Sequence, residues 1–174
     1  MKKSAFTLLM LLILTSTSSN AETSASESFA QMKNLVGIWT ETEKPNSKFS
    51  IEFSLVSNNS VLVETWRRGT KKHSLTLYHL DGKNLIATHY CPQGNQPRLQ
   101  MTPNSTKKKL SFSYRDATNL SSLDHSHQHS LAFVLPNKSG QLIRQESYLS
   151  GAGEKFSTLH LSKKQASPSP KDRP

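Results

Sequence analysis

Apolar and polar residues alternate along one short segment after another through most of this chain. Between positions 49 and 55, for example, every odd residue is Phe, Ile or Leu and every even residue is Ser or Glu. A repeat of two residues places successive side chains on opposite faces of a β-strand, so each strand has one apolar face and one wet face. The pattern predicts an all-β protein whose apolar faces meet in one interior.

Ten segments have strand character, and turn-forming residues such as Asp81-Gly82 separate them. They span residues 37–42, 49–55, 61–66, 74–80, 85–91, 98–101, 110–114, 129–135, 142–148 and 156–161. Their hairpin-length connections predict an antiparallel up-and-down barrel of about ten strands, because closure removes exposed sheet edges. A two-sheet sandwich is the alternative. One short helix over Ser28–Val36, with Ser28 as its cap, is expected before the first strand.

The N-terminus has the three parts of an export signal. Lys2 and Lys3 supply positive charge, residues 5–14 form an apolar run, and Ser19-Asn20-Ala21 offers small residues to a signal peptidase. The run is too short to span a bilayer, which takes about 20 residues, so no transmembrane anchor is expected. We therefore predict a bacterial periplasmic or secreted protein. It divides into a signal peptide (1–21), a flexible stretch (22–27), a β-barrel domain (28–162) and a disordered tail (163–174).

Charge and cysteine content narrow the class of protein further. The chain has 22 Lys and Arg against 12 Asp and Glu, a formal net charge of +10. Outside the cytoplasm this charge does not indicate nucleic acid; it fits either simple solubility or weak contact with an anionic envelope surface. Cys91 is the single cysteine, so stability must come from a core and not from a disulfide within the chain. Its thiol is either a small buried group or a reactive or ligating one.

The most distinctive motifs flank the end of the fifth predicted strand. Thr88–Cys91 reads Thr-His-Tyr-Cys, and Gly94–Arg98 reads Gly-Asn-Gln-Pro-Arg. They resemble the signature of a family of uncharacterised bacterial proteins with a lipocalin-like or calycin-like barrel, an architecture shared with fatty-acid-binding proteins. Leu35–Trp39 is similar to the Gly-x-Trp opening of calycin barrels, and residues 116–119 are similar to a later family motif. His127–His129 departs from the His-Met-His of that family. The resemblance implies a barrel with an internal cavity, and no particular ligand or reaction.

Pairing parity across the Asp81-Gly82 turn puts Thr76, Tyr78, His89 and Cys91 on one face of the hairpin, and either face can be the inner one. We predict that the barrel binds a small amphipathic or hydrophobic molecule, lipid-like or anionic. The apolar lining is expected from Phe53, Leu77, Phe112, Leu131 and Phe133. The polar groups expected to orient the ligand are Tyr78, His89, Cys91, Asn95, Gln96, Arg98, His127 and His129.

Three of these polar residues have an alternative interpretation. Arg98 at a barrel mouth can hold a carboxylate or phosphate through two parallel hydrogen bonds, or it can be a solvated edge charge. Asn95 and Gln96 can equally satisfy the backbone groups of their own loop.

Two other functions stay open at this level. Cys91 and His89 lie two residues apart on one strand face and can form the nucleophile and base of a cysteine- and histidine-dependent enzyme, although no known nucleophile motif surrounds them. His127 and His129 have the parity of the apolar residues 131–135, which places them near the inward face, and with His89 they can form a metal site. No motif indicates a cofactor.

Overall fold

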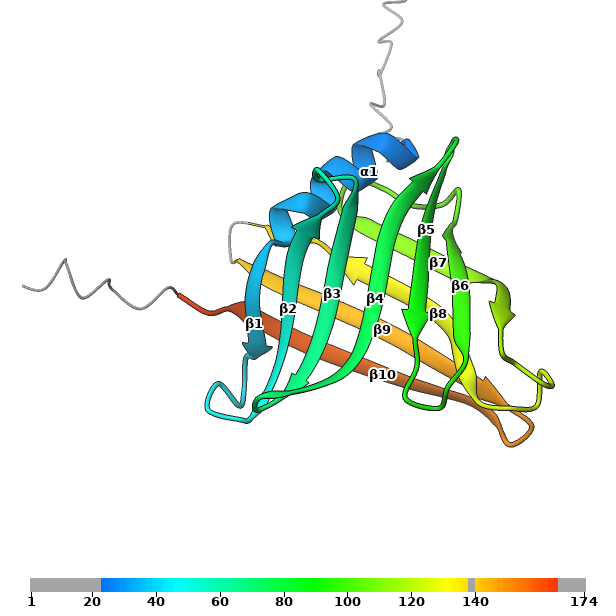
Figure 1. Cartoon of the computed structure of the whole chain (residues 1–174). Helices are drawn as coiled ribbons and strands as arrows, with labels where there is room; N and C mark the ends of the chain where they lie inside the picture. The colour runs from blue at the N-terminus through cyan, green and yellow to red at the C-terminus, as the bar shows by residue number, and fades with distance from the viewer. Residues whose placement is uncertain (1–22, 138–139, 166–174) are drawn as a thin grey trace, which may run out of the picture.

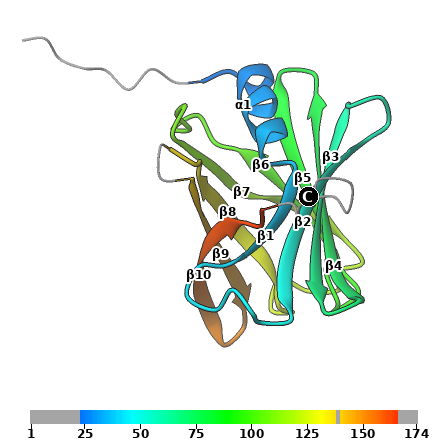
Figure 2. The ribbon, with the colours of Figure 1, turned by 90° about the vertical axis from the view of Figure 1, so that its left-hand side faces the viewer.

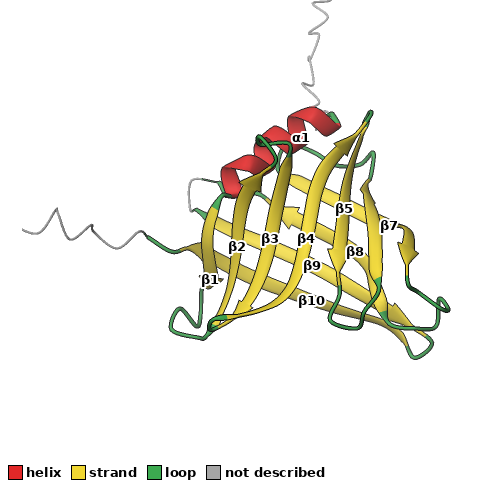
Figure 3. Ribbon diagram, in the orientation of Figure 1, coloured by secondary structure: helices red, strands yellow, loops and turns green. Residues whose placement is uncertain are grey.

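The computed structural model describes residues 23–137 and 140–165, which form a closed barrel of ten antiparallel strands with a short helix across one end (Figure 1). Each strand pairs with its neighbours in sequence, and the first strand pairs with the last. The predicted up-and-down barrel is therefore confirmed, and strands account for most of the described chain (Figure 3). The predicted signal peptide lies outside the described residues.

The helical segments are α1 (Ala25–Met32) and the 3₁₀-helix η1 (Lys33–Leu35). The strands are β1 (Gly37–Glu41), β2 (Phe49–Val56), β3 (Val61–Arg68), β4 (Lys71–Asp81), β5 (Asn84–Tyr90), β6 (Gln96–Met101), β7 (Lys109–Thr118), β8 (His127–Val134), β9 (Gln141–Ser150) and β10 (Gly153–Lys163). Most are longer than predicted, because the backbone ladder continues past the last apolar side chain. At the β4–β5 turn Gly82 has a φ of 58°, a left-handed value that glycine adopts readily.

The helix begins earlier than the apolar spacing predicts. Ser24, and not Ser28, caps α1: its Oγ accepts a hydrogen bond from the Glu27 N–H at 3.2 Å, and the Glu27 carboxylate accepts one from the Ser24 N–H at 3.0 Å. This reciprocal capping box makes residues 25–27 helical, which corrects the flexible stretch predicted over 22–27. No helix among residues 23–137 and 140–165 is long and apolar enough to cross a membrane.

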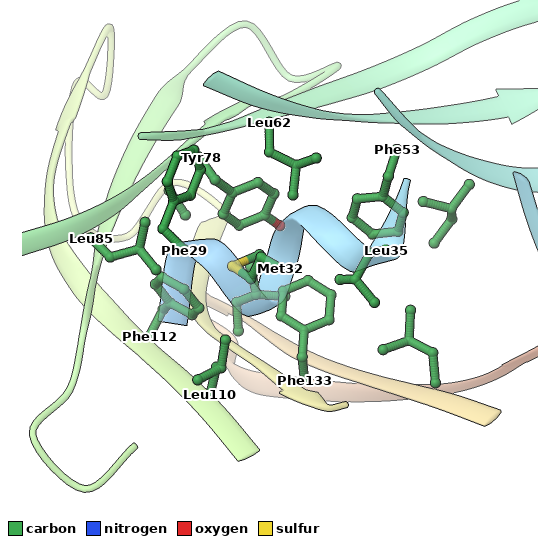
Figure 4. Close-up of a cluster of buried hydrophobic side chains, with 14 of the residues drawn as sticks. Phe29, Met32, Leu35, Phe53, Leu62, Tyr78, Leu85, Leu110, Phe112 and Phe133 are labelled. Atoms are coloured by element: carbon green, nitrogen blue, oxygen red, sulfur yellow. The ribbon is translucent and has the colours of Figure 1, made fainter. Parts of the chain in front are cut away.

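Helix α1 lies across one end of the barrel (Figure 2), and side chains of α1 and η1 pack into the core there. Phe29, Met32 and Leu35 are buried against inward residues of the strands, and Figure 4 shows this cluster: Phe53, Leu62, Tyr78, Leu85, Leu110, Phe112 and Phe133. The helix thus contributes to the same core as the barrel wall, and its apolar face is satisfied there.

Packing at this end corrects the expected cavity. Phe53, Phe112 and Phe133 expose at most 2% of their surface to water, and the ring of Phe133 lies 6.3 Å from that of Phe53 and 6.0 Å from that of Tyr78. These side chains fill the helix end of the interior and leave no room for a ligand between them. Leu131 joins the same core, whereas Leu77 does not, because it alternates with the inward residues of β4.

A short seam between β1 and β10 closes the barrel, with Trp39 paired to Lys163. The Trp39 indole N–H donates to the Leu35 carbonyl at 2.7 Å, and Lys163 Nζ lies 5.8 Å from the indole ring centroid. Gly37 leaves space for this arrangement, since a Cβ there would lie 2.6 Å from Lys163 Cε. Lys163 is therefore part of the barrel, which corrects the start of the predicted tail; residues 166–174 lie outside the described chain.

Candidate functional site

Charged and polar side chains gather inside the barrel in the half away from α1. They follow apolar inward residues along the strands: Glu64 comes two positions after Leu62 on β3, and Arg144 two positions after Leu142 on β9. The register of the ladders keeps this parity, so these side chains share the interior with the core. The interior thus has an apolar half next to the helix and a polar half beyond it.

Arg144 is the centre of the polar half and is 1% exposed. Its Nη1 lies 2.8 Å from Glu146 Oε2, and its Nε lies 2.8 Å from Glu64 Oε1, an ion-pair distance without hydrogen-bond angles. Burial alone lowers the pKa of Arg144, but the two carboxylates outweigh it and raise that pKa. For Glu146 burial acts in the opposite direction and raises the pKa. The Arg144 guanidinium outweighs burial, so the net pKa of Glu146 is lowered and the carboxyl stays ionised. We call Glu64, Arg144 and Glu146 the buried triad.

Aromatic residues hold the Glu64 side of the triad. Tyr78 donates its hydroxyl to Glu64 Oε2, and the Trp66 indole N–H donates to Oε1 at 2.5 Å. The Trp66 ring also covers the Arg144 guanidinium, whose Cζ lies 4.7 Å from the ring centroid. Tyr78, which the sequence predicted as a ligand contact, therefore belongs to the support of the triad.

Gln128 joins the triad from β8 and was not predicted. Its Nε2 donates to Glu146 Oε2 at 2.8 Å, which assigns the amide orientation, because a carboxylate only accepts. The amide oxygen then has no hydrogen-bond partner within residues 23–137 and 140–165, and the same holds for Nη2 of Arg144. Both side chains are at most 1% exposed, so Nη2 and the amide oxygen are buried without a partner, while Nε keeps its ion-pair contact with Glu64.

His89 lies beside the triad on the inward face of the β4–β5 hairpin, which settles which face is inside. Its Nδ1 is 2.9 Å from Thr76 Oγ1 and its Nε2 is 3.1 Å from the Tyr148 hydroxyl. Burial, and then the positive charge of Arg144, lower the pKa of His89 to about 4, so the imidazole is neutral at neutral pH. Burial also raises the pKa of Tyr148, which keeps its hydroxyl protonated.

Cys91 shares the inward face as predicted, but its surroundings do not activate it. The residue is 8% exposed, and burial raises the pKa of its thiol. A nucleophilic cysteine needs the opposite shift and a base. Both nitrogens of His89 are already engaged by Thr76 and Tyr148. The geometry therefore gives the enzyme hypothesis no support.

Asn95 and Gln96 hold the backbone at the loop after Cys91, and Asn95 is itself buried there. Asn95 Nδ2 donates to the Ser126 carbonyl at 3.0 Å, and Gln96 Nε2 donates to the Gly94 carbonyl at 2.8 Å, so both hold backbone. Arg98 is exposed and pairs with Asp116 through two hydrogen bonds, one of 2.7 Å from Nη2. Arg98 faces outward and does not line the barrel mouth, because inward Leu99 and Pro97 flank it on β6.

A β-bulge explains why the predicted histidine site does not form. The β8–β9 register shifts between Gln128 and Ser130, so His129 is the extra residue and parity changes there. Gln128 consequently faces the triad, while His127 and His129 lie against Tyr114, with ring centroids 4.9 and 5.9 Å from it. His89 is engaged elsewhere, and the described part of the chain contains no group of three candidate metal ligands.

Sequence reasoning missed Glu64, Arg144, Glu146 and Gln128, although a signal for three of them was present. Leu142, Arg144, Glu146 and Tyr148 occupy alternate positions, so two charges continue the apolar face of a strand. A charged residue with the parity of core neighbours is unusual, because burying an unpaired charge is costly. Two such strands carrying opposite charges predict a buried pair.

Glu146 is the most exposed member of the triad, and partly exposed side chains surround it. Trp66 and Tyr148 are partly buried, and Glu146 keeps 10% of its side chain exposed. The exposed Ser157 donates to Glu146 Oε1 at 3.3 Å. Among the described residues Gly153–Leu159 of β10 pair with β9 alone, since the β1–β10 ladder starts at Leu161. We call Trp66, Tyr148, Glu146 and Ser157 the mouth.

Comparisons of the chain with models of protein families, with curated proteins and with solved structures found no match. The resemblance to the bacterial barrel family therefore stays a prediction. What the protein does must be argued from the geometry of its interior.

Proposed function

We propose that this protein is an exported binding protein that takes a small amphipathic molecule into the polar half of its barrel through the mouth. The barrel fold supports a binding role, since such barrels enclose their ligands. The N-terminal pattern of Lys2 and Lys3, an apolar run and small residues supports export. Because core side chains fill the helix end of the interior, we place the ligand in the polar half.

The observation that carries this proposal is the unpaired donor and acceptor at the triad. A buried polar atom without a partner costs about 1–3 kcal/mol, and Arg144 Nη2 and Gln128 Oε1 have no partner among the described residues. A ligand that satisfies both atoms recovers that free energy. Because the Trp66 ring covers the guanidinium, entry of a ligand requires this side chain to move.

Aromatic surface beside the triad suits the apolar part of such a ligand. Phe49 and Trp66 are both partly buried, and their rings meet edge to face with centroids 5.2 Å apart. An apolar chain against these rings, with its polar head toward Arg144, matches the division of most ligand sites into apolar walls and a few orienting polar groups.

Native mass spectrometry of the protein purified from the periplasm of an expressing bacterium tests the proposal. We expect the wild type to retain an organic mass, and Arg144→Met to lose it. Arg98→Met is the matched control, because it removes an equally large guanidinium from the outer surface. Wild-type protein that is recovered empty and binds no member of a lipid and haem panel would contradict the proposal.

A further inference from the structure

We infer that the site selects an uncharged head group that both donates and accepts hydrogen bonds, such as a hydroxyl, and rejects carboxylates. This inference rests on the proposed function and names the ligand class. It replaces the expectation of an anionic ligand held by Arg98, whose guanidinium is paired with Asp116 outside the barrel.

The charges of the triad favour an uncharged head group. Two carboxylates, Glu64 and Glu146, face the single guanidinium of Arg144, so the triad carries one net negative charge. The groups beside it add none, because His89 is neutral and the pKa values of Tyr148 and Cys91 are raised. A second negative charge buried against the triad would be repelled, because the guanidinium of Arg144 is already shared by two carboxylates.

The unpaired hydrogen-bonding atoms at the triad also favour a hydroxyl, independently of charge. Arg144 Nη2 needs an acceptor, and Gln128 Oε1 needs a donor. A carboxylate only accepts and an ammonium only donates, whereas a hydroxyl does both. The two side chains that carry these unpaired atoms are neighbours, because Arg144 Nη1 and Gln128 Nε2 both lie 2.8 Å from the same oxygen of Glu146.

Three probes with the same apolar chain separate these possibilities: octanol, octanoate and octylammonium. Binding of each to the full chain at neutral pH is followed by the indole N–H resonance of Trp66. We expect the Kd of octanol to be at least about tenfold lower than that of octanoate, because the negative triad repels the carboxylate. The Kd of octanol should also be lower than that of octylammonium.

A charge variant tests the cause of the selection. Glu146→Gln makes the triad neutral, so octanoate should gain at least about tenfold relative to octanol. Asp116→Asn is the matched control, because it removes a carboxylate on the outer surface, and it should leave the ratio unchanged. If Glu146→Gln does not fold, the relative affinities of the three probes for the wild type still test whether the site selects an uncharged head group.

The outcomes distinguish the inference from the proposed function. Octanoate or octylammonium binding the wild type as tightly as octanol overturns the inference and leaves the binding function standing. If none of the three probes moves the Trp66 resonance, binding of small amphipathic molecules at this site is itself contradicted.

Discussion

Arg144 is a charge that the fold must keep paired. It is 1% exposed and lies 2.8 Å from both Glu64 and Glu146, so its removal leaves two buried carboxylates without a cation. We expect Arg144→Met to lower the free energy of unfolding by about 3–5 kcal/mol, the usual effect of breaking a buried pair by removing one partner. Urea unfolding followed by circular dichroism measures it.

The control for this variant is Arg98→Met. Its ion pair with Asp116 is exposed, and solvent screens such pairs, so we expect little measurable change in stability. Equal losses in the two variants would show that Arg144 does not hold the interior together.

His89 makes stability depend on pH in a defined window. Its pKa is about 4 in the folded protein, where burial and Arg144 disfavour its charge, against 6.5 for an ordinary histidine. Between these values the unfolded chain binds a proton that the folded chain does not, so stability is complete above pH 6.5 and is lost as the pH falls toward 4. We expect a loss from this group of about 1.6 kcal/mol between pH 6.5 and pH 5.

Unfolding of His89→Gln at both pH values isolates this contribution, because the variant cannot titrate there. The difference in stability between the two pH values should shrink by that amount, whereas His79→Gln, at a partly buried position on the outer face of β4, should keep the wild-type difference. An unchanged pH dependence in His89→Gln would mean that the imidazole titrates normally in the folded protein.

Helix α1 closes one end of the barrel with its apolar side chains. Met32 is 0% exposed and packs among the aromatic residues of the helix end. We expect Met32→Ala to cost about 2–5 kcal/mol, because a cavity opens where neighbouring strands cannot close in. Asn34→Ala on η1, at an exposed position, should cost little. Comparable losses of stability in the two variants would contradict the role of α1 in closing the barrel.

Alternation predicts elements well and irregularities badly. Every strand was predictable because each has an apolar face that must meet the same interior. The turn at Gly82 was predictable from local chemistry, although Asp81 pairs with Asn84 and the loop is residues 82–83. The bulge at His129 was not, since one extra residue changes parity without changing composition. The capping box at Ser24 could have been found, because Glu27 follows three residues later.

For the whole molecule, the candidate site depends on which strands meet across the interior. Tyr78, His89 and Cys91 were placed together correctly because one tight turn joins their strands. Glu64 and Arg144 come from strands that are 80 positions apart in the sequence numbering, and only barrel closure brings them within an ion-pair distance of 2.8 Å. The sequence left open whether Arg98 faces the barrel mouth or solvent, because a loop separates β6 from the β4–β5 hairpin and the β6–β7 register shifts between Arg98 and Leu99.

The most direct test of ligand binding in the polar half uses the two tryptophans of the chain as probe and internal control. Trp66 covers Arg144 at the mouth, and Trp39 lies at the β1–β10 seam with its indole N–H bonded to Leu35. We expect a titration with octanol to shift the indole N–H resonance of Trp66 saturably and to leave that of Trp39 in place. A Trp66 resonance that does not move at the solubility limit of octanol, or a Trp39 resonance that moves in its place, would contradict the account.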